Sequence, residues 1–467
     1  MLERVAVVSI APILPGAVHG GSQRILEGVL HGLANAGADV RVVCSWRPEN
    51  DGGFDLAPKI SIEPSLQLSG YFPDPWEVAP HKILQSAMAI APVFDWADSV
   101  YLHADTFYLR GIIPEDLRVV RSFHDFHYET ALISAFGFNA DQTIVPSEYL
   151  KRCIEATAGA VPGGSPGQVT VVPNGIDLDL YRPESAVIPR GVRERGPNDL
   201  ILLWPHRPDT QKGIIEAIQI AGTLKRKLAD RNVRLLVPQH VDASSSNETR
   251  SFYSNAVNKA AEAGVMESLE FAPWWEGEET PYAYNFADVT LCPGNFIESF
   301  SLVAYESLAC GTPVVASTVG ALRELPDHPD VHLFPWGDIK AASKAVEKAS
   351  SGMTDVNGIR SLLADQYSFE AMQLGYVEAI TNNTTQTTQI SEHLEQTYSL
   401  APWCAVSEDR VYHDYEFGWS TRPELAAYLS TLQSTCSSFV LSDANHSGVP
   451  SDQIEAAMRD GIIVQNK

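Results

Sequence analysis

Short apolar segments alternate with longer amphipathic segments along most of the chain. The apolar segments are rich in Val, Ile and Leu and end at turn-forming residues, a pattern typical of strands buried on both faces of a parallel sheet. The amphipathic segments repeat apolar residues at helical spacing. Strands are predicted at 5–10, 39–44, 98–103, 119–127, 141–145, 169–172, 200–204, 234–237, 269–272, 287–292 and 314–316, and helices at 22–36, 148–154, 214–228, 302–310, 338–349 and 367–380. This order predicts an α/β fold with doubly wound parallel sheets.

The same pattern predicts how the chain divides into domains. Residues 1–185 and 186–366 are each expected to form one parallel-sheet domain, since the chain is long enough for two cores. Residues 382–389 are Asn, Thr and Gln without an apolar period, which predicts a linker. Residues 390–467 carry two helical patterns and a predicted strand at 439–441. They are interpreted as a small α+β accessory module of winged-helix type.

One stretch combines strand, loop, helix and turn in a way that favours phosphate binding. The strand 287–292 ends at Pro293, and a helix follows from Leu302. Gly311 is expected to end this helix, and Pro313 lies just beyond it. The first backbone N–H groups of a helix have no partner within the helix and lie at the positive end of its dipole. The helix start is therefore predicted to bind an anionic group such as phosphate.

Two glutamates flank this helix start and carry the resemblance to a known family. Glu298 and Glu306 are separated by seven residues and followed by a small-residue turn and a Pro-Val-Val strand. The stretch resembles the nucleotide-sugar site of retaining glycosyltransferases of family 4. The resemblance implies the GT-B fold, two Rossmann-like domains with an interdomain cleft, and a final helix, 367–381, that crosses back to the first domain. Ser299 and Ser301 stand where the family usually has glycine.

A second motif supports the same resemblance. The family pattern is Gly-Arg-Leu, three residues, then Lys-Gly, and Arg207, Lys212 and Gly213 match it. His206 and Pro208 depart from it. Departure of a nucleoside diphosphate develops negative charge, which an Arg fork and a Lys ammonium stabilise more strongly in the transition state than in the ground state. These two cations are therefore predicted to be catalytic.

The resemblance also implies roles for individual residues. Arg207 and Lys212 would hold the diphosphate, Glu298 the sugar hydroxyls and Glu306 the ribose. His124, at the polar end of the strand 119–127, would contact the donor sugar. The remaining residues predicted to bind the donor lie in a glycine loop and at the start of the helix: Gly20, Gly21, Ser299, Phe300, Ser301 and Leu302.

Several residues allow more than one interpretation. His124, Asp125 and His127 could be metal ligands, but no third partner group is apparent, and a structural histidine is the other alternative. Trp274 or Trp275 could stack on the base or close the edge of the domain. No metal site is predicted.

The Gly-, Pro- and Asp-rich residues 49–80 are expected to form a long surface loop. Within this loop, Phe72 and Trp76 could line an acceptor site or pin the loop to the domain.

Composition and charge narrow the functional classes. The formal net charge is −25, which opposes binding to nucleic acid or to anionic membranes through basic side chains. No apolar run reaches membrane-spanning length. The six cysteines are far apart and without metal-ligand spacing, as expected for reduced thiols in a reducing compartment. A cytoplasmic location is therefore expected.

Together, the motifs predict an enzyme that moves a sugar from a nucleotide-sugar donor to an acceptor with retention of configuration. No metal and no cofactor other than the nucleotide-sugar co-substrate are expected. The acceptor could be a saccharide, a lipid-linked glycan or a small molecule. A nucleotide-sugar epimerase or hydrolase of the same fold, and a non-catalytic sugar-nucleotide-binding protein, remain alternatives. Residues 390–467 are expected to affect acceptor recognition or self-association rather than donor chemistry.

Overall fold

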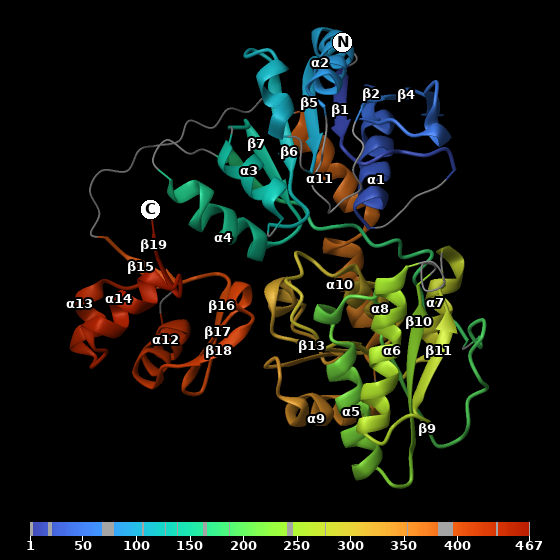
Figure 1. Cartoon of the computed structure of the whole chain (residues 1–467), viewed down its shortest axis with the longest axis vertical. Coiled ribbons are helices and arrows are strands. Elements are labelled where there is room, and N and C mark those ends of the chain that lie inside the picture. The colour runs from blue at the N-terminus through green and yellow to red at the C-terminus, as the bar shows by residue number, and fades with distance from the viewer. Residues whose placement is uncertain are drawn as a thin grey trace. The chain divides into compact units, whose positions relative to one another are not determined.

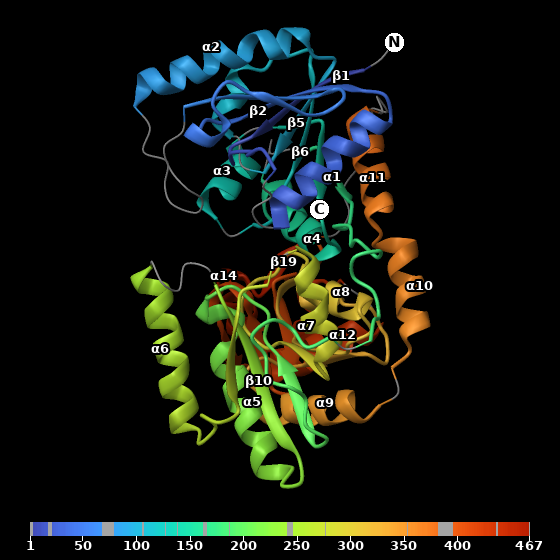
Figure 2. The ribbon, with the colours of Figure 1, turned by 90° about the vertical axis from the view of Figure 1, so that its right-hand side faces the viewer.

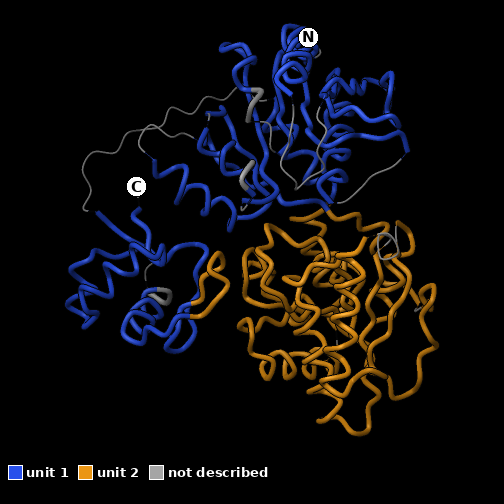
Figure 3. The backbone as a smooth tube through the Cα atoms, viewed as in Figure 1, with its two compact units in different colours: residues 1–175, 369–411, 420–467 blue, residues 176–368, 412–419 orange. Residues whose placement is uncertain are grey.

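The computed structural model describes residues 3–16, 21–67, 79–104, 107–126, 128–137, 139–161, 166–185, 187–240, 246–275, 277–352, 354–381, 396–435 and 438–466. The predicted linker 382–389 and the aromatic residues Phe72 and Trp76 lie outside these ranges. The chain forms two compact units (Figure 3). Unit 1 contains residues 1–175, 369–411 and 420–467, and unit 2 contains residues 176–368 and 412–419.

Unit 1 contains an eight-stranded sheet with the order β3-β4-β2-β1-β5-β6-β7-β8 (Figure 1). Neighbouring strands are parallel except for β3 and β4. The elements are β1 (Arg4–Ser9), α1 (Gly21–Asn35), β2 (Asp39–Ser45), β3 (Phe54–Ala57), β4 (Ile60–Leu66), α2 (Pro80–Trp96), β5 (Ser99–His103), β6 (Arg118–Ser122), α3 (Glu129–Gly137), β7 (Gln142–Val145), α4 (Glu148–Ala156), β8 (Gln168–Val171) and α11 (Phe369–Thr381). The predicted doubly wound sheet is thus present.

Alternation of side chains along β1 builds the two cores of this sheet. Val5 and Val7 pack with residues of α1 and α11. Ala6 and Val8 lie on the opposite face and pack with residues of α2. Figure 2 shows α2 on one side of these strands and α1 with α11 on the other. Gly28 on α1 lets α11 approach closely, because a Cβ atom there would lie 2.5 Å from the ring of Phe369.

Unit 2 contains a six-stranded parallel sheet with the order β11-β10-β9-β12-β13-β14. Its elements are β9 (Asp199–Leu203), η4 (Thr210–Lys212), α5 (Ile214–Lys227), β10 (Asn232–Gln239), α6 (Asn247–Glu262), β11 (Leu269–Pro273), α7 (Thr280–Phe286), β12 (Val289–Cys292), α8 (Leu302–Ala309), β13 (Val314–Ser317), η7 (Gly320–Glu324), β14 (Val331–Phe334), α9 (Ile339–Ser351) and α10 (Val356–Gln366). Leu200 and Leu202 pack toward α5, α6 and α9, whereas Ile201 and Leu203 pack toward α7, α8 and α10.

The described residues of the C-terminal region form two small sheets and three helices. β15 pairs with β19, and β16, β17 and β18 form a three-stranded sheet. The elements are β15 (Tyr398–Leu400), β16 (Cys404–Ser407), β17 (Arg410–His413), η8 (Asp414–Glu416), β18 (Gly418–Thr421), α12 (Pro423–Thr435), α13 (Leu441–His446), α14 (Ser451–Arg459) and β19 (Ile463–Gln465). The segment 412–419, which contains the end of β17, η8 and the start of β18, belongs to unit 2.

Several segments differ from the sequence prediction. The predicted strand 119–127 is shorter, because β6 ends at Ser122 and a loop follows over 123–126. The expected loop 49–80 contains the β3–β4 hairpin, because Gly52 and Gly53 adopt positive φ angles and reverse the chain before β3. The predicted strand 439–441 is wrong. Phe439 forms only an isolated bridge with Tyr398, and Leu441 begins α13. Three apolar residues are too few to distinguish a strand from a helix start.

A buried ion-pair network lies where β9, β10 and β11 begin. The Arg234 guanidinium is almost fully buried and donates to Asp199 at 2.6 Å and to Glu270 at 2.8 Å. Arg193 adds two side-chain hydrogen bonds to Glu270, at 3.0 and 3.1 Å. Burial alone would raise the pKa values of Asp199 and Glu270, but hydrogen bonds outweigh burial and lower both. Asp199 accepts from Asn232, the Gly196 N–H and Arg234, and Glu270 accepts from Arg193 and Arg234. The network keeps its carboxylates ionised inside the unit.

Among the helices that the structure describes, none is both long and apolar enough to cross a membrane.

Candidate functional site

The predicted phosphate motif is formed in unit 2 at the carboxyl ends of β9 and β12. The turn that follows β9 carries Arg207, Asp209 and Lys212, and Gly213 ends it with a left-handed φ of 85°. The Asp209 carboxylate accepts a hydrogen bond from the Gln211 N–H at 2.8 Å. Carboxyl ends of parallel strands are where open α/β sheets bind ligands. Arg207 and Lys212 thus lie at the carboxyl edge of the sheet, where the sequence pattern predicts them.

Two glycines bring this turn against the loop after β12. A Cβ atom at Gly213 would lie 2.4 Å from the backbone N of Gly294, and one at Gly294 would lie 1.9 Å from the Gln211 carbonyl oxygen. The Phe296 N–H donates to that same carbonyl at 2.9 Å. Any larger residue would force the two backbones apart. The glycines therefore fix the distance between Lys212 and the loop that carries Glu298.

Lys212 and Glu298 form an ion pair at the centre of the site. The Lys212 ammonium donates to Glu298 Oε1 at 2.7 Å, and the two side chains are 18% and 16% exposed. The ammonium also lies 3.4 Å from the centre of the Phe296 ring. An ammonium has three N–H donors, and Glu298 takes only one of them. Lys212 is therefore held in place while it can still donate to an anionic ligand.

Arg207 and His206 differ in exposure and in charge. Arg207 is exposed, and its guanidinium makes no hydrogen bond or ion pair with any residue that the structure describes. His206 is buried and its Nε2 lies 2.9 Å from the Leu291 carbonyl oxygen. Burial, and next the charge of Lys212, lower the pKa of His206 to about 4. His206 is therefore neutral at neutral pH and ties β9 to β12, whereas Arg207 is available to a ligand.

The start of α8 offers backbone donors beside this ion pair. The N–H groups of Phe300, Ser301 and Leu302 have no acceptor among the described residues. Ser299 precedes them and is partly buried. The Phe300 ring stacks on Tyr305 with a centroid distance of 4.4 Å, which fixes the loop against the helix. The helix start thus has the donors that the sequence predicted for phosphate.

Ser301 adopts a backbone conformation that favours glycine. Its φ and ψ angles are 77° and 76°, in the left-handed region. We expect Ser301→Gly to raise the free energy of unfolding by about 1 kcal/mol, because relief of the strain exceeds the added entropy of the unfolded chain. Ser299→Gly is the matched control, because Ser299 is not among the residues with positive φ and should gain nothing. Equal shifts of both variants in urea unfolding would contradict this explanation.

Glu306 is buried on α8. Its Oε2 accepts a hydrogen bond from the Tyr284 hydroxyl at 2.9 Å. Burial, and next the Glu306 charge, raise the pKa of Tyr284 well above its usual value, so the hydroxyl keeps its proton as a donor. Tyr284, on α7, was not singled out from the sequence, because nothing in its local pattern points to a glutamate 22 residues later.

The predicted residues of unit 1 lie around a buried polar cluster. Ser22, His103 and His124 come from α1, from the end of β5 and from the loop after β6. His103 Nε2 lies 2.9 Å from Ser22 Oγ, and the His103 and His124 rings are 4.5 Å apart. His124 Nε2 lies 3.1 Å from Ser122 Oγ, which in turn contacts the Tyr101 hydroxyl at 2.8 Å. Gly21 begins α1 next to Ser22, whereas Gly20 lies outside the described residues.

Burial makes this histidine pair neutral. Burial lowers the pKa of His124 to about 4. Burial, and next the neighbouring His124, lower the pKa of His103 well below its usual value. At neutral pH His124 therefore offers a hydrogen-bonding imidazole and not a cation. His103 was missed from the sequence, although it ends the predicted strand 98–103 at the edge where ligands bind.

The possible metal ligands and the two tryptophans that could stack on a base lie in different surroundings. Among the residues that the structure describes, no three His, Cys, Asp or Glu side chains gather where they could hold a metal ion, and His127 lies outside that part of the chain. Trp275 is buried, and its indole N–H donates to the Arg190 carbonyl at 3.1 Å, a structural role. Trp274 is partly exposed, with its ring 5.0 Å from that of His240.

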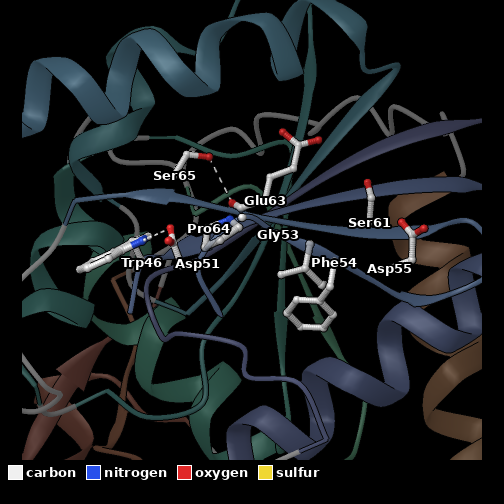
Figure 4. Close-up of a pocket in the computed structure, with 11 residues that line it drawn as sticks. Trp46, Asp51, Gly53, Phe54, Asp55, Ser61, Glu63, Pro64 and Ser65 are labelled. Carbon is white, nitrogen blue, oxygen red and sulfur yellow. Dashed lines mark hydrogen bonds between the residues drawn. The ribbon is translucent and has the colours of Figure 1, made fainter. Parts of the chain in front are cut away.

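A hollow of about 450 Å³ lies against the β3–β4 hairpin of unit 1. Figure 4 shows that Phe54 and Glu63 point in opposite directions from the hairpin. The Trp46 indole donates to Asp51 at 3.0 Å. None of the predicted site residues lines this hollow.

The chain matches two family models that agree with this geometry. Residues 190–355 match the model of the glycosyl transferases group 1, and residues 19–180 match that of glycosyltransferase family 4. A D-inositol 3-phosphate glycosyltransferase of Streptosporangium roseum is 30% identical over 235 residues, 46% of this chain and 53% of the relative. The protein of the same name from Thermomonospora curvata is 35% identical over 167 residues, 34% of this chain and 38% of the relative. The matches thus span about half or less of these curated relatives.

Solved structures share the architecture. Sucrose-phosphate synthase of Thermosynechococcus elongatus has a TM-score of 0.59 at 20% identity and covers 80% of this chain and 97% of its own. Anabaena Alr3699/HepE in complex with UDP-glucose has a TM-score of 0.57 at 15% identity and covers 80% and 98%. With its two parallel-sheet units, the chain has the GT-B fold of glycosyltransferases. It belongs to the group 1 glycosyltransferases, with a first half of the family 4 type.

Proposed function

We propose that this protein transfers a sugar from a nucleotide-sugar donor to an acceptor with retention of the anomeric configuration and without a metal ion. The observation that carries the proposal is the Lys212–Glu298 pair, held by close glycine contacts beside the start of α8. A cation and free helix N–H groups are complementary to a diphosphate. A carboxylate at the same point is complementary to sugar hydroxyls.

Each residue has a defined role in this proposal. Lys212 and the exposed Arg207 stabilise the negative charge that develops on the departing nucleoside diphosphate. Glu298 accepts hydrogen bonds from the sugar and also holds Lys212. Glu306 accepts from the ribose, and neutral His124 hydrogen-bonds the sugar. The leaving phosphate assists removal of the acceptor proton on the same face, so the chain supplies no nucleophile.

The acceptor class is the open part of the proposal. The relatives are named for D-inositol 3-phosphate, which makes inositol phosphates the first acceptors to test, followed by saccharides and lipid-linked glycans. The structures in complex with UDP and UDP-glucose make these the first donor ligands to test.

A binding screen tests the donor part of the proposal. Bound ligand stabilises a folded protein by mass action. We expect one of UDP, GDP or ADP to raise the melting temperature of the wild type, and the shift should be the same in the presence of a chelator. The shift should disappear in the double variant Arg207→Ala/Lys212→Ala. A shift that depends on added divalent metal would overturn the metal-independent part, and absence of any shift would overturn the donor assignment.

A further inference from the structure

The segment 412–419 is joined to unit 2 by a buried ion pair. Asp414 is 0% exposed and accepts two hydrogen bonds from the Arg323 guanidinium, Nη1 at 2.9 Å and Nη2 at 2.5 Å. This two-bond fork geometry fixes orientation as well as distance. A buried carboxylate needs such a partner, because an unpaired charge away from water is costly. The contact is therefore specific for an Asp–Arg pair.

Aromatic side chains also join this segment to unit 2. Trp419 donates its indole N–H to the Trp336 carbonyl oxygen at 3.0 Å. The Tyr412 ring packs against both indoles, with centroid distances of 5.7 Å to Trp336 and 5.2 Å to Trp419. Burial and then the Asp414 charge raise the pKa of Tyr412, while the Arg323 charge acts in the opposite direction.

Arg323 connects the segment with the centre of the site. It belongs to η7, whose Ala321 N–H donates to the Glu298 carbonyl at 2.8 Å. Gly320, at a φ of 54°, packs so closely that a Cβ atom would lie 2.6 Å from the same carbonyl oxygen. A continuous set of contacts therefore runs from Asp414 through Arg323 and η7 to Glu298, and from Glu298 to Lys212.

We propose that the segment 412–419 is a positioning element of the donor site. Asp414 holds Arg323, Arg323 holds η7, and η7 holds the backbone of Glu298 in the orientation that pairs with Lys212. The proposal rests on the proposed function as far as the donor is concerned. The sequence predicts that all of 390–467 affects acceptor recognition or self-association rather than donor chemistry, whereas the proposal gives 412–419 a role in donor binding.

The ligand-independent test is hydrogen exchange. We expect Asp414→Asn, which keeps the shape and removes the charge, to speed amide exchange at 296–298 and 320–322 at least tenfold, with β9 and β10 unchanged. Glu416→Gln is the matched control, because this substitution removes one negative charge from the same turn, and the Glu416 side chain is exposed. Unchanged exchange in both segments, or equal acceleration across unit 2, would overturn the proposal.

Donor binding gives the second readout. We expect Asp414→Asn to weaken binding of UDP, or of whichever of UDP, GDP and ADP the wild type binds best, about tenfold, or about 1.4 kcal/mol. The KM for the acceptor should not change. Arg323→Lys, which keeps the charge but loses the fork, should weaken binding in the same direction and covers the case in which Asp414→Asn does not fold. Unaltered affinity in both variants would overturn the proposal. A wild type that binds none of the nucleotides would instead refute the proposed function, and hydrogen exchange would still decide the coupling.

Discussion

Replacing Lys212 by alanine is expected to lower turnover by about a hundredfold or more, the scale of losing one preorganised charge-stabilising group. The same substitution leaves Glu298 partly buried without its partner, which turns an attractive site for a diphosphate into a repulsive one. Arg207→Ala should lower turnover to a similar extent for a different reason. Arg207 is exposed and makes no hydrogen bond or ion pair with the residues that the structure describes, so its loss should remove only a contact to the ligand.

A matched pair of measurements separates these effects from damage to the fold. Lys227→Ala removes an exposed lysine that pairs with Glu347 at 2.6 Å and should leave turnover unchanged. Arg207→Ala should melt like the wild type, because its side chain is exposed and makes no hydrogen bond or ion pair with the described residues. Full activity in the double variant Arg207→Ala/Lys212→Ala would refute the assignment of the diphosphate site.

The second large effect is on stability. Arg234→Met is expected to lower the free energy of unfolding by about 3–5 kcal/mol, the cost of leaving buried carboxylates without their cation. Asp199 and Glu270 would remain inside unit 2 with Arg193 as their only charged partner among those described. Arg190→Met is the control, because Arg190 makes a two-bond pair with Glu279 that is exposed to water, and exposed ion pairs contribute little to stability.

The pH dependence of this loss has a defined sign. The pKa values of Asp199 and Glu270 are lowered in the folded wild type, so the stability they contribute is present above their unfolded values and is lost as the pH falls through the folded values. The unfolded values are about 4. The difference between wild type and Arg234→Met should therefore be largest at neutral pH and shrink below about pH 4. A difference that is constant with pH in denaturant titrations would show that lost packing, not charge, explains the effect.

The sequence predicts the parts of the site that depend on local pattern. The short apolar runs show where each buried strand ends. Gly311, with a φ of 81°, follows the last turn of α8 as expected. The positions of Lys212, Glu298 and the helix start therefore follow from the order of strands and turns. The resemblance added the roles of these residues, which spacing alone does not give.

What the sequence does not predict depends on contacts between distant residues. Asp414 and Arg323 are 91 residues apart, and neither local pattern indicates the other. The β3–β4 hairpin left a signal, since apolar and polar residues alternate at 60–63, but the surrounding glycines and prolines favour a loop. The left-handed backbone at Ser301 could be anticipated only from the glycine that the family has there.

Release of nucleoside diphosphate, measured with and without acceptor, tests the central claim most directly. Purified chain would be incubated with the sugar nucleotide whose nucleotide binds best, alone or with a panel of inositol phosphates, saccharides and lipid-linked glycans. The account predicts release only when an acceptor is present, in equal amount to a glycosylated product with the anomeric configuration of the donor. Equal release without any acceptor would show a hydrolase, and a product of inverted configuration would contradict the retaining mechanism.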